Sequence, residues 1–111
     1  MKSQWKIWCE TKNINTANNL LLKVKKQLST IVLDETLAPY EKGGFVISFW
    51  VNHPCVSWND YVVEVIALGQ SLGRNWGING DITQQVDGWS NESSIPGIQS
   101  IQWMCDEQFQ A

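Results

Sequence analysis

The chain contains a single histidine, His53, which stands two residues before Cys55 at the start of a predicted helix. A helix N-terminus lowers the pKa of a nearby thiol, and an imidazole within hydrogen-bond reach of the sulfur would activate it as a nucleophile. Pro54 constrains the geometry between the two side chains, and no third residue that would orient the imidazole is evident. Neighbouring carboxylates such as Asp34 and Glu35 point to opposite faces of a strand and make poor acid–base pairs. We therefore expect no catalytic residues and no enzymatic activity.

The sequence also gives no sign of a metal or cofactor site. The three cysteines are far apart and form no C-x-x-C pair, so they are expected to be free thiols in a reducing compartment. Four glycines follow a predicted helix, whereas a phosphate-binding loop precedes one, and neither G-x-G-x-x-G nor G-x-x-x-x-G-K-[ST] occurs. We interpret these glycines as a helix cap, a turn and a strand bulge: Gly69, Gly73, Gly77 and Gly80.

Tryptophan is the unusual residue of this chain, with 7 among 111 residues. Indole rings are costly to expose and are enriched at the hot spots of protein interfaces. We expect at least two of Trp50, Trp76, Trp89 and Trp103 to be substantially exposed, because a domain this small has trouble hiding all seven. Trp89 lies among carboxylates, and Trp50 lies on the face of its strand opposite the strongest apolar positions. The predicted partner-binding residues are Trp50, Asp81, Asp87, Trp89 and Glu92.

The charges are distributed unevenly along the chain. The net charge is −3, with a balance of +3 over residues 1–42 and −6 over residues 43–111. An acidic surface steers basic proteins and repels nucleic acid, so we expect a basic protein partner and no direct nucleic-acid binding. No apolar run reaches the length of a membrane span, and the N-terminus lacks the apolar core of a signal peptide. We expect a cytoplasmic protein that binds no membrane.

Periodicity predicts the elements that position these residues. Period-2 alternation predicts strands over residues 5–9, 45–52 and about 100–105, and a longer strand over about 76–86, bulged at Gly80. Apolar residues at helical spacing predict one helix capped by Asn15 or Thr16 and a second from Ser57 to Gly73. Residues 31–38 either extend the first helix or form an edge strand. Residues 87–97 are expected to be a turn-rich connection, and the tail 106–111 is expected to fray.

This order of elements predicts one α+β domain over residues 1–111. Two helices would pack on one face of a mostly antiparallel sheet of four to five strands. The layout is close to a ferredoxin-like fold with an extra C-terminal strand. We expect a monomer or weak homodimer.

The span from about Phe45 to Cys105 resembles the small immunity proteins of bacterial toxin–immunity pairs, including those of contact-dependent growth inhibition. The resemblance is carried by the Ser-Trp start of the second helix, by LGQSLGRNWGINGDITQQVDGWS and by the closing IPGIQSIQWMC. It implies an acidic, tryptophan-rich, cytoplasmic protein that binds a cognate toxin domain, often a basic nuclease, and has no catalytic residues. It identifies no contact residue in this chain.

Three hypotheses follow from the sequence. The first is an immunity protein that neutralises a toxin domain. The second is a small self-associating or ligand-binding module with an unknown partner, and the third is an enzyme. A partner encoded by a neighbouring gene would distinguish the first from the second, and turnover lost on Cys55→Ser would support the third.

Overall fold

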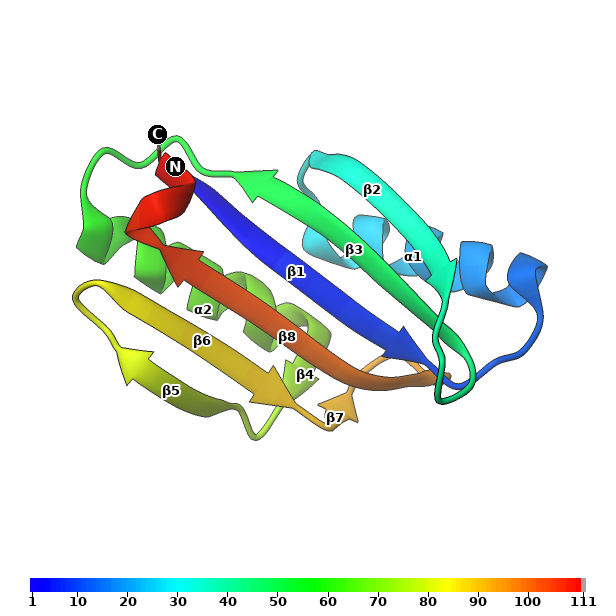
Figure 1. Cartoon of the computed structure of the whole chain (residues 1–111). Coiled ribbons are helices and arrows are strands. Elements are labelled where there is room, and N and C mark those ends of the chain that lie inside the picture. The colour runs from blue at the N-terminus through cyan, green and yellow to red at the C-terminus, as the bar shows by residue number, and fades with distance from the viewer. Residues whose placement is uncertain (111) are drawn as a thin grey trace.

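Alternating apolar residues place one face of a six-stranded sheet against two helices and leave the other face without a second layer (Figure 1). The computed structural model describes residues 1–110. The elements are β1 (Lys2–Cys9), α1 (Ile14–Leu28), β2 (Val32–Pro39), β3 (Phe45–Asn52), α2 (Trp58–Leu72), β4 (Gly73–Arg74), β5 (Gly77–Asp81), β6 (Gln85–Ser90), β7 (Glu92–Ser93), β8 (Ile98–Asp106) and the 3₁₀ helix η1 (Glu107–Gln110).

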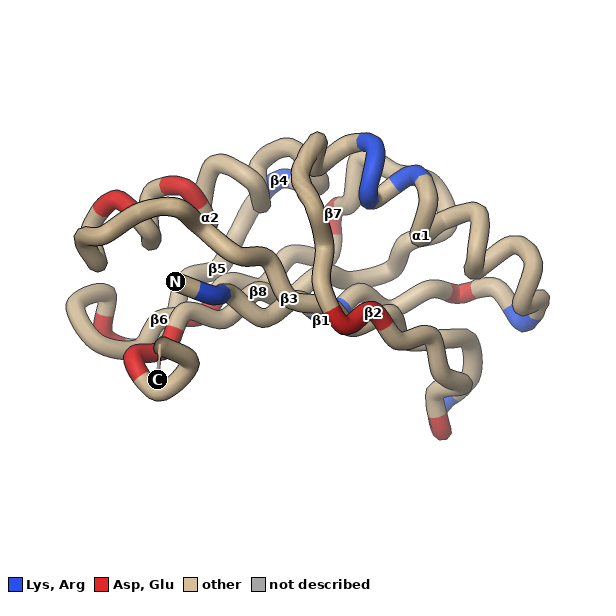
Figure 2. Tube along the Cα trace, turned by 90° about the horizontal axis from the view of Figure 1, so that it is seen from above, with Lys and Arg blue, Asp and Glu red and all other residues tan. Residues whose placement is uncertain are grey.

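The large sheet has the strand order β2-β3-β1-β8-β6-β5, and every neighbouring pair is antiparallel. Strands β1, β2, β3 and β8 with the two helices form the predicted ferredoxin-like α+β layout. The sheet has six strands rather than four or five. The additional strands β5 and β6 precede the last strand in sequence and extend the sheet beyond β8. A two-stranded sheet, β4 and β7, lies at the level of the helices (Figure 2).

Side-chain caps determine where the helices begin. Asn13, rather than Asn15 or Thr16, caps α1, because its Oδ1 accepts hydrogen bonds from the backbone N–H of both of those residues. The Ser57 cap of α2 is confirmed: its Oγ accepts the backbone N–H of Asp60 at 3.1 Å. Both helices turn apolar residues toward the sheet.

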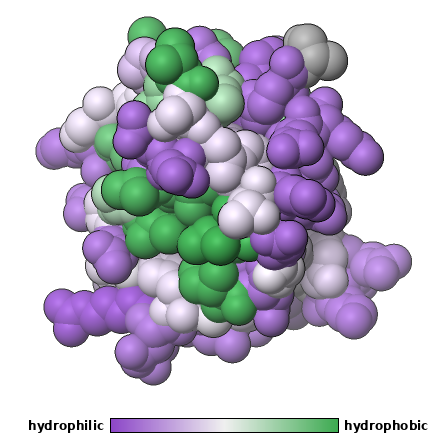
Figure 3. Space-filling view, turned by 90° about the vertical axis from the view of Figure 1, so that its left-hand side faces the viewer, coloured by the Kyte–Doolittle hydropathy of each residue, from purple (hydrophilic) through white to green (hydrophobic). Residues whose placement is uncertain are grey.

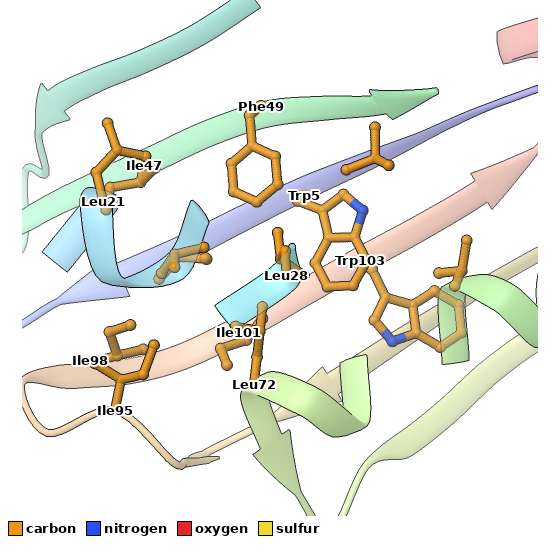
Figure 4. Close-up of a cluster of buried hydrophobic side chains, with 14 of the residues drawn as sticks. Trp5, Leu21, Leu28, Ile47, Phe49, Leu72, Ile95, Ile98, Ile101 and Trp103 are labelled. Atoms are coloured by element: carbon orange, nitrogen blue, oxygen red, sulfur yellow. The ribbon is translucent and has the colours of Figure 1, made fainter. Parts of the chain in front are cut away.

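The core lies between the helices and the inward face of the sheet (Figure 4). Trp5 of β1 stacks on Phe49 of β3, with ring centroids 6.1 Å apart. Trp103 of β8 is 1% exposed and packs where α2 and β6 present no side chain, at Gly69 and Gly88. A Cβ on Gly88 would lie only 2.4 Å from the Trp103 ring. Position 88 therefore needs glycine because the Trp103 ring occupies the space of a side chain, and not because the backbone turns there.

Several boundary predictions were resolved or overturned. Of the two alternatives for residues 31–38, the edge strand is confirmed: β2 spans Val32–Pro39, and the helix ends at Leu28. The single strand predicted over 76–86 is wrong: β5 and β6 form a hairpin. Asp81 begins its turn, since its carboxylate accepts the backbone N–H and the hydroxyl of Thr83. The region expected to be turn-rich, 87–97, begins inside β6, and Gly80 pairs in register with Val86 without a bulge.

Of the tail that was expected to fray, Asp106 ends β8 and residues 107–110 form η1; Ala111 lies outside the described residues. Gln110 accepts a hydrogen bond from the backbone N–H of Lys2 at 2.7 Å and donates to its carbonyl at 3.1 Å. Phe109 packs edge-on against Trp50. Glycine and proline are absent from this tail, and two side chains hold it against β1 and β3.

Gly88→Ala is expected to destabilise the fold, because the new methyl group meets the Trp103 ring from a rigid strand. We expect the free energy of unfolding to fall by about 1–3 kcal/mol. Denaturant unfolding followed by Trp fluorescence measures this change. Gly77→Ala is the matched control, since its Cβ has no neighbour closer than 3.9 Å; equal losses in the two variants would contradict the packing role of Gly88.

Candidate functional site: the open face of the sheet

The face of the sheet opposite the helices is covered only by η1, at one end, among residues 1–110 (Figure 2). Strand register lines up its outward residues in rows. One row runs from Trp50 through Gln4 and Met104 to Asp87. The next row runs from Ser48 through Lys6 and Gln102 to Trp89. This open face is therefore a continuous surface of polar side chains interrupted by large aromatic ones.

Trp8 and Trp89 meet across this face although β8 lies between their strands. Their ring centroids are 5.1 Å apart. The residue beneath them on β8 is Ser100, which pairs with Trp8, is 7% exposed and is small enough to let the two indoles approach. Tyr40 contacts the far side of Trp8 edge-on, at 6.4 Å between centroids. The three rings form a single aromatic cluster on the open face.

Hydrogen bonds fix the orientation of Trp89. Its Nε1 donates to Oδ1 of Asn91 at 2.9 Å, and the same oxygen accepts the hydroxyl of Ser100 at 3.1 Å. Trp89 nevertheless remains 36% exposed. Beside it, the aromatic cluster borders a hollow of about 300 Å³ that is completed by Lys42 and Gln99. Trp89 is thus a rigid, partly exposed indole at the edge of a cavity.

The structure brings four of the five predicted partner-binding residues onto this face. Trp50, Asp87 and Trp89 point outward from β3 and β6, and the register places Asp81 on the same side at the end of β5. Glu92 does not join them: it lies in β7, at the level of the helices, where it accepts a hydrogen bond from Asn75.

Of the four tryptophans of which at least two were expected to be substantially exposed, only Trp89 is exposed, at 36%. Trp50 and Trp76 are half-buried, and Trp103 is 1% exposed. The sequence analysis missed Trp8 and Tyr40. Trp8 was detectable, because it alternates out of phase with Trp5 and Ile7 and so must face away from the core.

The charged side chains of the open face are distributed unevenly. Hydrogen bonds from Thr83 hold the pKa of Asp81 below its usual value, so this carboxylate is charged at neutral pH. Asp81 and Asp87 lie toward the end of the sheet that also carries η1, and neither forms an ion pair within the described chain. Lys6 stands near the centre of the face, in the row of Trp89. Lys2 also faces this side, at the η1 end of β1, so the negative charge is concentrated on the β5–β6 side of that end.

A second arrangement of reactive side chains lies at the edge of the core. The hydroxyl of Ser3 is 2.7 Å from Nε2 of His53, and Nδ1 of His53 is 3.1 Å from a carboxylate oxygen of Glu64. The other Glu64 oxygen accepts the thiol proton of Cys55 at 2.9 Å. The order serine–histidine–carboxylate matches that of hydrolytic triads. Glu64 is a third residue that could orient the imidazole of His53, and the sequence alone did not indicate it.

The geometry of this array does not suit catalysis. Ser3 is fully buried and its oxygen also accepts the indole N–H of Trp5, so no substrate reaches it. Nδ1 of His53 has no well-aligned hydrogen bond despite its short distance to Glu64. Burial lowers the pKa of His53. The hydrogen bond that the Cys55 thiol donates to Glu64 raises the pKa of that thiol. A neutral imidazole and a protonated thiol fit a structural role.

The other two cysteines are also unreactive. Burial raises the pKa of Cys9 to about 11 and that of Cys105 to about 12. A thiolate is the nucleophile and the metal ligand, so these buried thiols supply neither function at neutral pH. Within residues 1–110, no group of three or more His, Cys, Asp and Glu side chains is arranged to hold a metal ion.

A cleft lies on the helix side of the sheet, between α2 and the edge strand β5. Its volume is about 490 Å³, and Ile66, Trp76, Ile78 and Trp103 form its apolar walls. Arg74 and Gln70 stand at its rim. Apolar side chains gather on the adjoining end of the molecule (Figure 3). This cleft is separate from the open face, because the sheet lies between them.

No family model matches this chain, and neither a curated protein nor a solved structure is detectably similar to it. Within residues 1–110, no helix has the length and apolar character needed to cross a membrane. The geometry of the site is therefore the basis for the function proposed below.

Acidification is expected to destabilise the protein through His53. Its folded pKa lies below the ordinary value of 6.5, so the unfolded chain binds more protons as the pH falls through 6.5. The free energy of unfolding should decrease from pH 7.5 to pH 5.5. The lowered pKa of Glu64 adds a loss of the same sign at lower pH.

Thermal unfolding of the wild type and of His53→Gln at several pH values tests this expectation. The variant has a lower absolute stability, but its stability should depend less on pH between 7.5 and 5.5. Parallel pH profiles of the two proteins would show that His53 does not titrate on unfolding in this range.

Proposed function

We propose that this chain is an immunity-type binding protein that neutralises a cognate toxin domain by docking it on the open face of the sheet. The observation that carries the proposal is the aromatic cluster of Trp8, Tyr40 and Trp89 on a sheet face that, within residues 1–110, only η1 covers, at one end. Packing against Trp8 and a hydrogen bond to Asn91 hold the Trp89 indole in one orientation, yet it stays 36% exposed. Such a rigid aromatic side chain suits an interface, because it loses little side-chain entropy on binding.

The charge pattern supports a basic partner. Asp81 and Asp87 lie on the same face as Trp89 and have no cation bound to them within the described chain. A basic surface, such as that of a nuclease domain, would be steered to this end of the face. Lys6, near the centre, would repel the same partner, so the carboxylates are expected to contact the rim of the interface rather than its middle.

We propose further that the protein acts by binding alone, without catalysis, and in the cytoplasm. The absence of access to Ser3 and the raised pKa values of the thiols support the first part. The second part is supported by three free cysteines, which fit a reducing compartment.

A small-ligand-binding module is the second candidate function. The apolar cleft beside Trp76 favours it, since its volume of about 490 Å³ lies in the range of ligand pockets. The two functions are distinguished by where substitutions act. Loss of partner binding on changing Trp89, with no effect of Ile66→Ala in the cleft, supports the immunity function.

Trp89→Ala is expected to weaken toxin binding by about 2 kcal/mol, roughly thirtyfold, mainly through faster dissociation. The measurement is surface plasmon resonance against the protein encoded by the adjacent gene, after co-expression has shown a complex. Leu22→Ala, an exposed apolar residue of α1 on the opposite side, is the control. Unchanged affinity for Trp89→Ala would place the interface elsewhere.

The double variant Asp81→Asn, Asp87→Asn is expected to slow association severalfold and to reduce its dependence on ionic strength. Glu92→Gln is the matched control, because this carboxylate lies at the level of the helices, bonded to Asn75. Association kinetics at low and moderate salt separate the two. A larger effect of Glu92→Gln than of the double variant would move the docking surface to the β7 side.

A further inference from the structure

The two edges of the large sheet are built differently. A free edge exposes backbone N–H and C=O groups that pair readily with another strand, and proteins usually protect such edges. The sheet order places β2 at one edge and β5 at the other. The sequence protects the first edge and leaves the second unprotected.

β2 carries three protective features. Its register against β3 shifts between Leu33 and Thr36, and Asp34 adopts a positive φ of 53° there, so the edge is irregular. Glu35 forms an ion pair with Lys25 of α1 at 2.6 Å, which adds charge to the strand. The strand ends at Pro39, which has no N–H to donate. Pairing of a further strand along β2 is therefore unfavourable.

β5 lacks the register shift, the ion pair and the proline of β2, although Gly80 near its end adopts a positive φ of 93°. Its five residues, GINGD, are all exposed, and they pair with β6 in an unbroken register from Gly77 to Asp81. The strand contains no proline and no lysine, and its only charge is Asp81 at the end. From Gly77 to Asn79 its outer edge is a row of unpaired backbone groups, and exposed apolar side chains lie beside it, since Ile78 is 45% exposed and Ile82 is 56% exposed.

We propose that β5 pairs with β5 of a second copy of this chain, antiparallel and centred on Asn79. This symmetric dimer would join the two large sheets edge to edge. It rests on the two edges of the sheet and not on the proposed toxin binding, because β5 pairs at the edge and leaves the open face of each copy uncovered.

The sequence of β5 is complementary to itself in this register. Ile78 of one copy stands opposite Gly80 of the other, on the helix side, so the larger side chain meets a residue that has none. On the open side, Asn79 meets Asn79, and two amides hydrogen-bond each other. Asp81 stands opposite Gly77, which keeps the two carboxylates apart. Beyond the strand ends, the half-buried Trp76 faces Ile82 of the other copy.

Pairing through β5 also explains why assembly would stop at two copies. The joined sheet has twelve strands, six from each copy, and both of its outer edges are β2. Because β2 is irregular, charged and ends in proline, no third copy adds. A five-residue strand buries little area, so the dimer is expected to be weak and to form only at high protein concentration.

Residue 79 lies on the proposed two-fold axis, which permits a specific test by charge. Asn79 is exposed, so substitutions there leave the monomer folded. Sedimentation velocity at rising concentration should show a monomer–dimer equilibrium for the wild type. Asn79→Lys should abolish the dimer, because two ammonium groups meet on the axis, and so should Asn79→Asp. An equal mixture of the two variants should restore it. Thr36→Lys on β2 is the control and should leave the dimer intact.

Disulfide trapping tests the register independently, in a Cys55→Ser background that removes the half-buried native thiol. Asn79→Cys should crosslink to itself on mild oxidation, whereas Ile78→Cys, which faces Gly80, should crosslink much less. A wild type that stays monomeric to near-millimolar concentration overturns the proposal, and the occupant of β5 is then a strand of another protein. A dimer that persists in Asn79→Lys, or equal crosslinking of the two cysteine variants, overturns it as well.

Discussion

Two helices cover only one face of this six-stranded sheet, and that constraint shapes the rest of the molecule. The inward face buries its apolar residues against α1 and α2, as the burial pattern of every long central strand shows. The outward face has no such cover, so its large side chains shield one another. Trp8 packs on Trp89, and Trp50 packs on Phe109. These mutual contacts reduce the exposed apolar area without removing it, and Trp89 remains 36% exposed.

The indole of Trp103 determines where the additional hairpin lies. It fills the space between Gly69 of α2 and Gly88 of β6, and Trp76 packs nearby at 6.2 Å between ring centroids. The β5–β6 hairpin is thereby fixed against both the helix and β8. Since Asp87 and Trp89 belong to β6, the position of the candidate binding face depends on a contact made on the other side of the sheet.

Much of the fold was predictable, because its signals are local. The alternation around Ile47 and the Ser57 cap each concern residues a few positions apart, and both were predicted correctly. The hairpin was missed because Ile78, Ile82 and Val86 continue the same spacing through a turn. A turn separates the two strands, and in it the Asp81 carboxylate accepts two hydrogen bonds from Thr83. Hydrophobic periodicity does not detect such a side-chain bond.

The candidate site was predicted less completely, because its parts meet only in three dimensions. Trp89 and Asp87 were identified from their own segment. Trp8 comes from the other end of the chain and reaches Trp89 only because Ser100 lies between their strands. Glu64 of α2 meets His53 because the connection from β3 brings the imidazole back beside the helix. Glu92 shows the converse, since a residue close to Trp89 in sequence lies on the other side of the sheet.

The clasp between Gln110 and Lys2 brings the first strand and the last helical turn into direct contact. Residues 2 and 110 therefore lie side by side, so the order of the elements along the chain could be changed without moving them in space. A short linker joining these two points would leave every strand pairing unchanged, and new ends could be opened in the exposed turn between β5 and β6. Such a permuted chain would begin and end next to Asp81, placing a reporter or an immobilisation handle beside one chosen edge of the sheet.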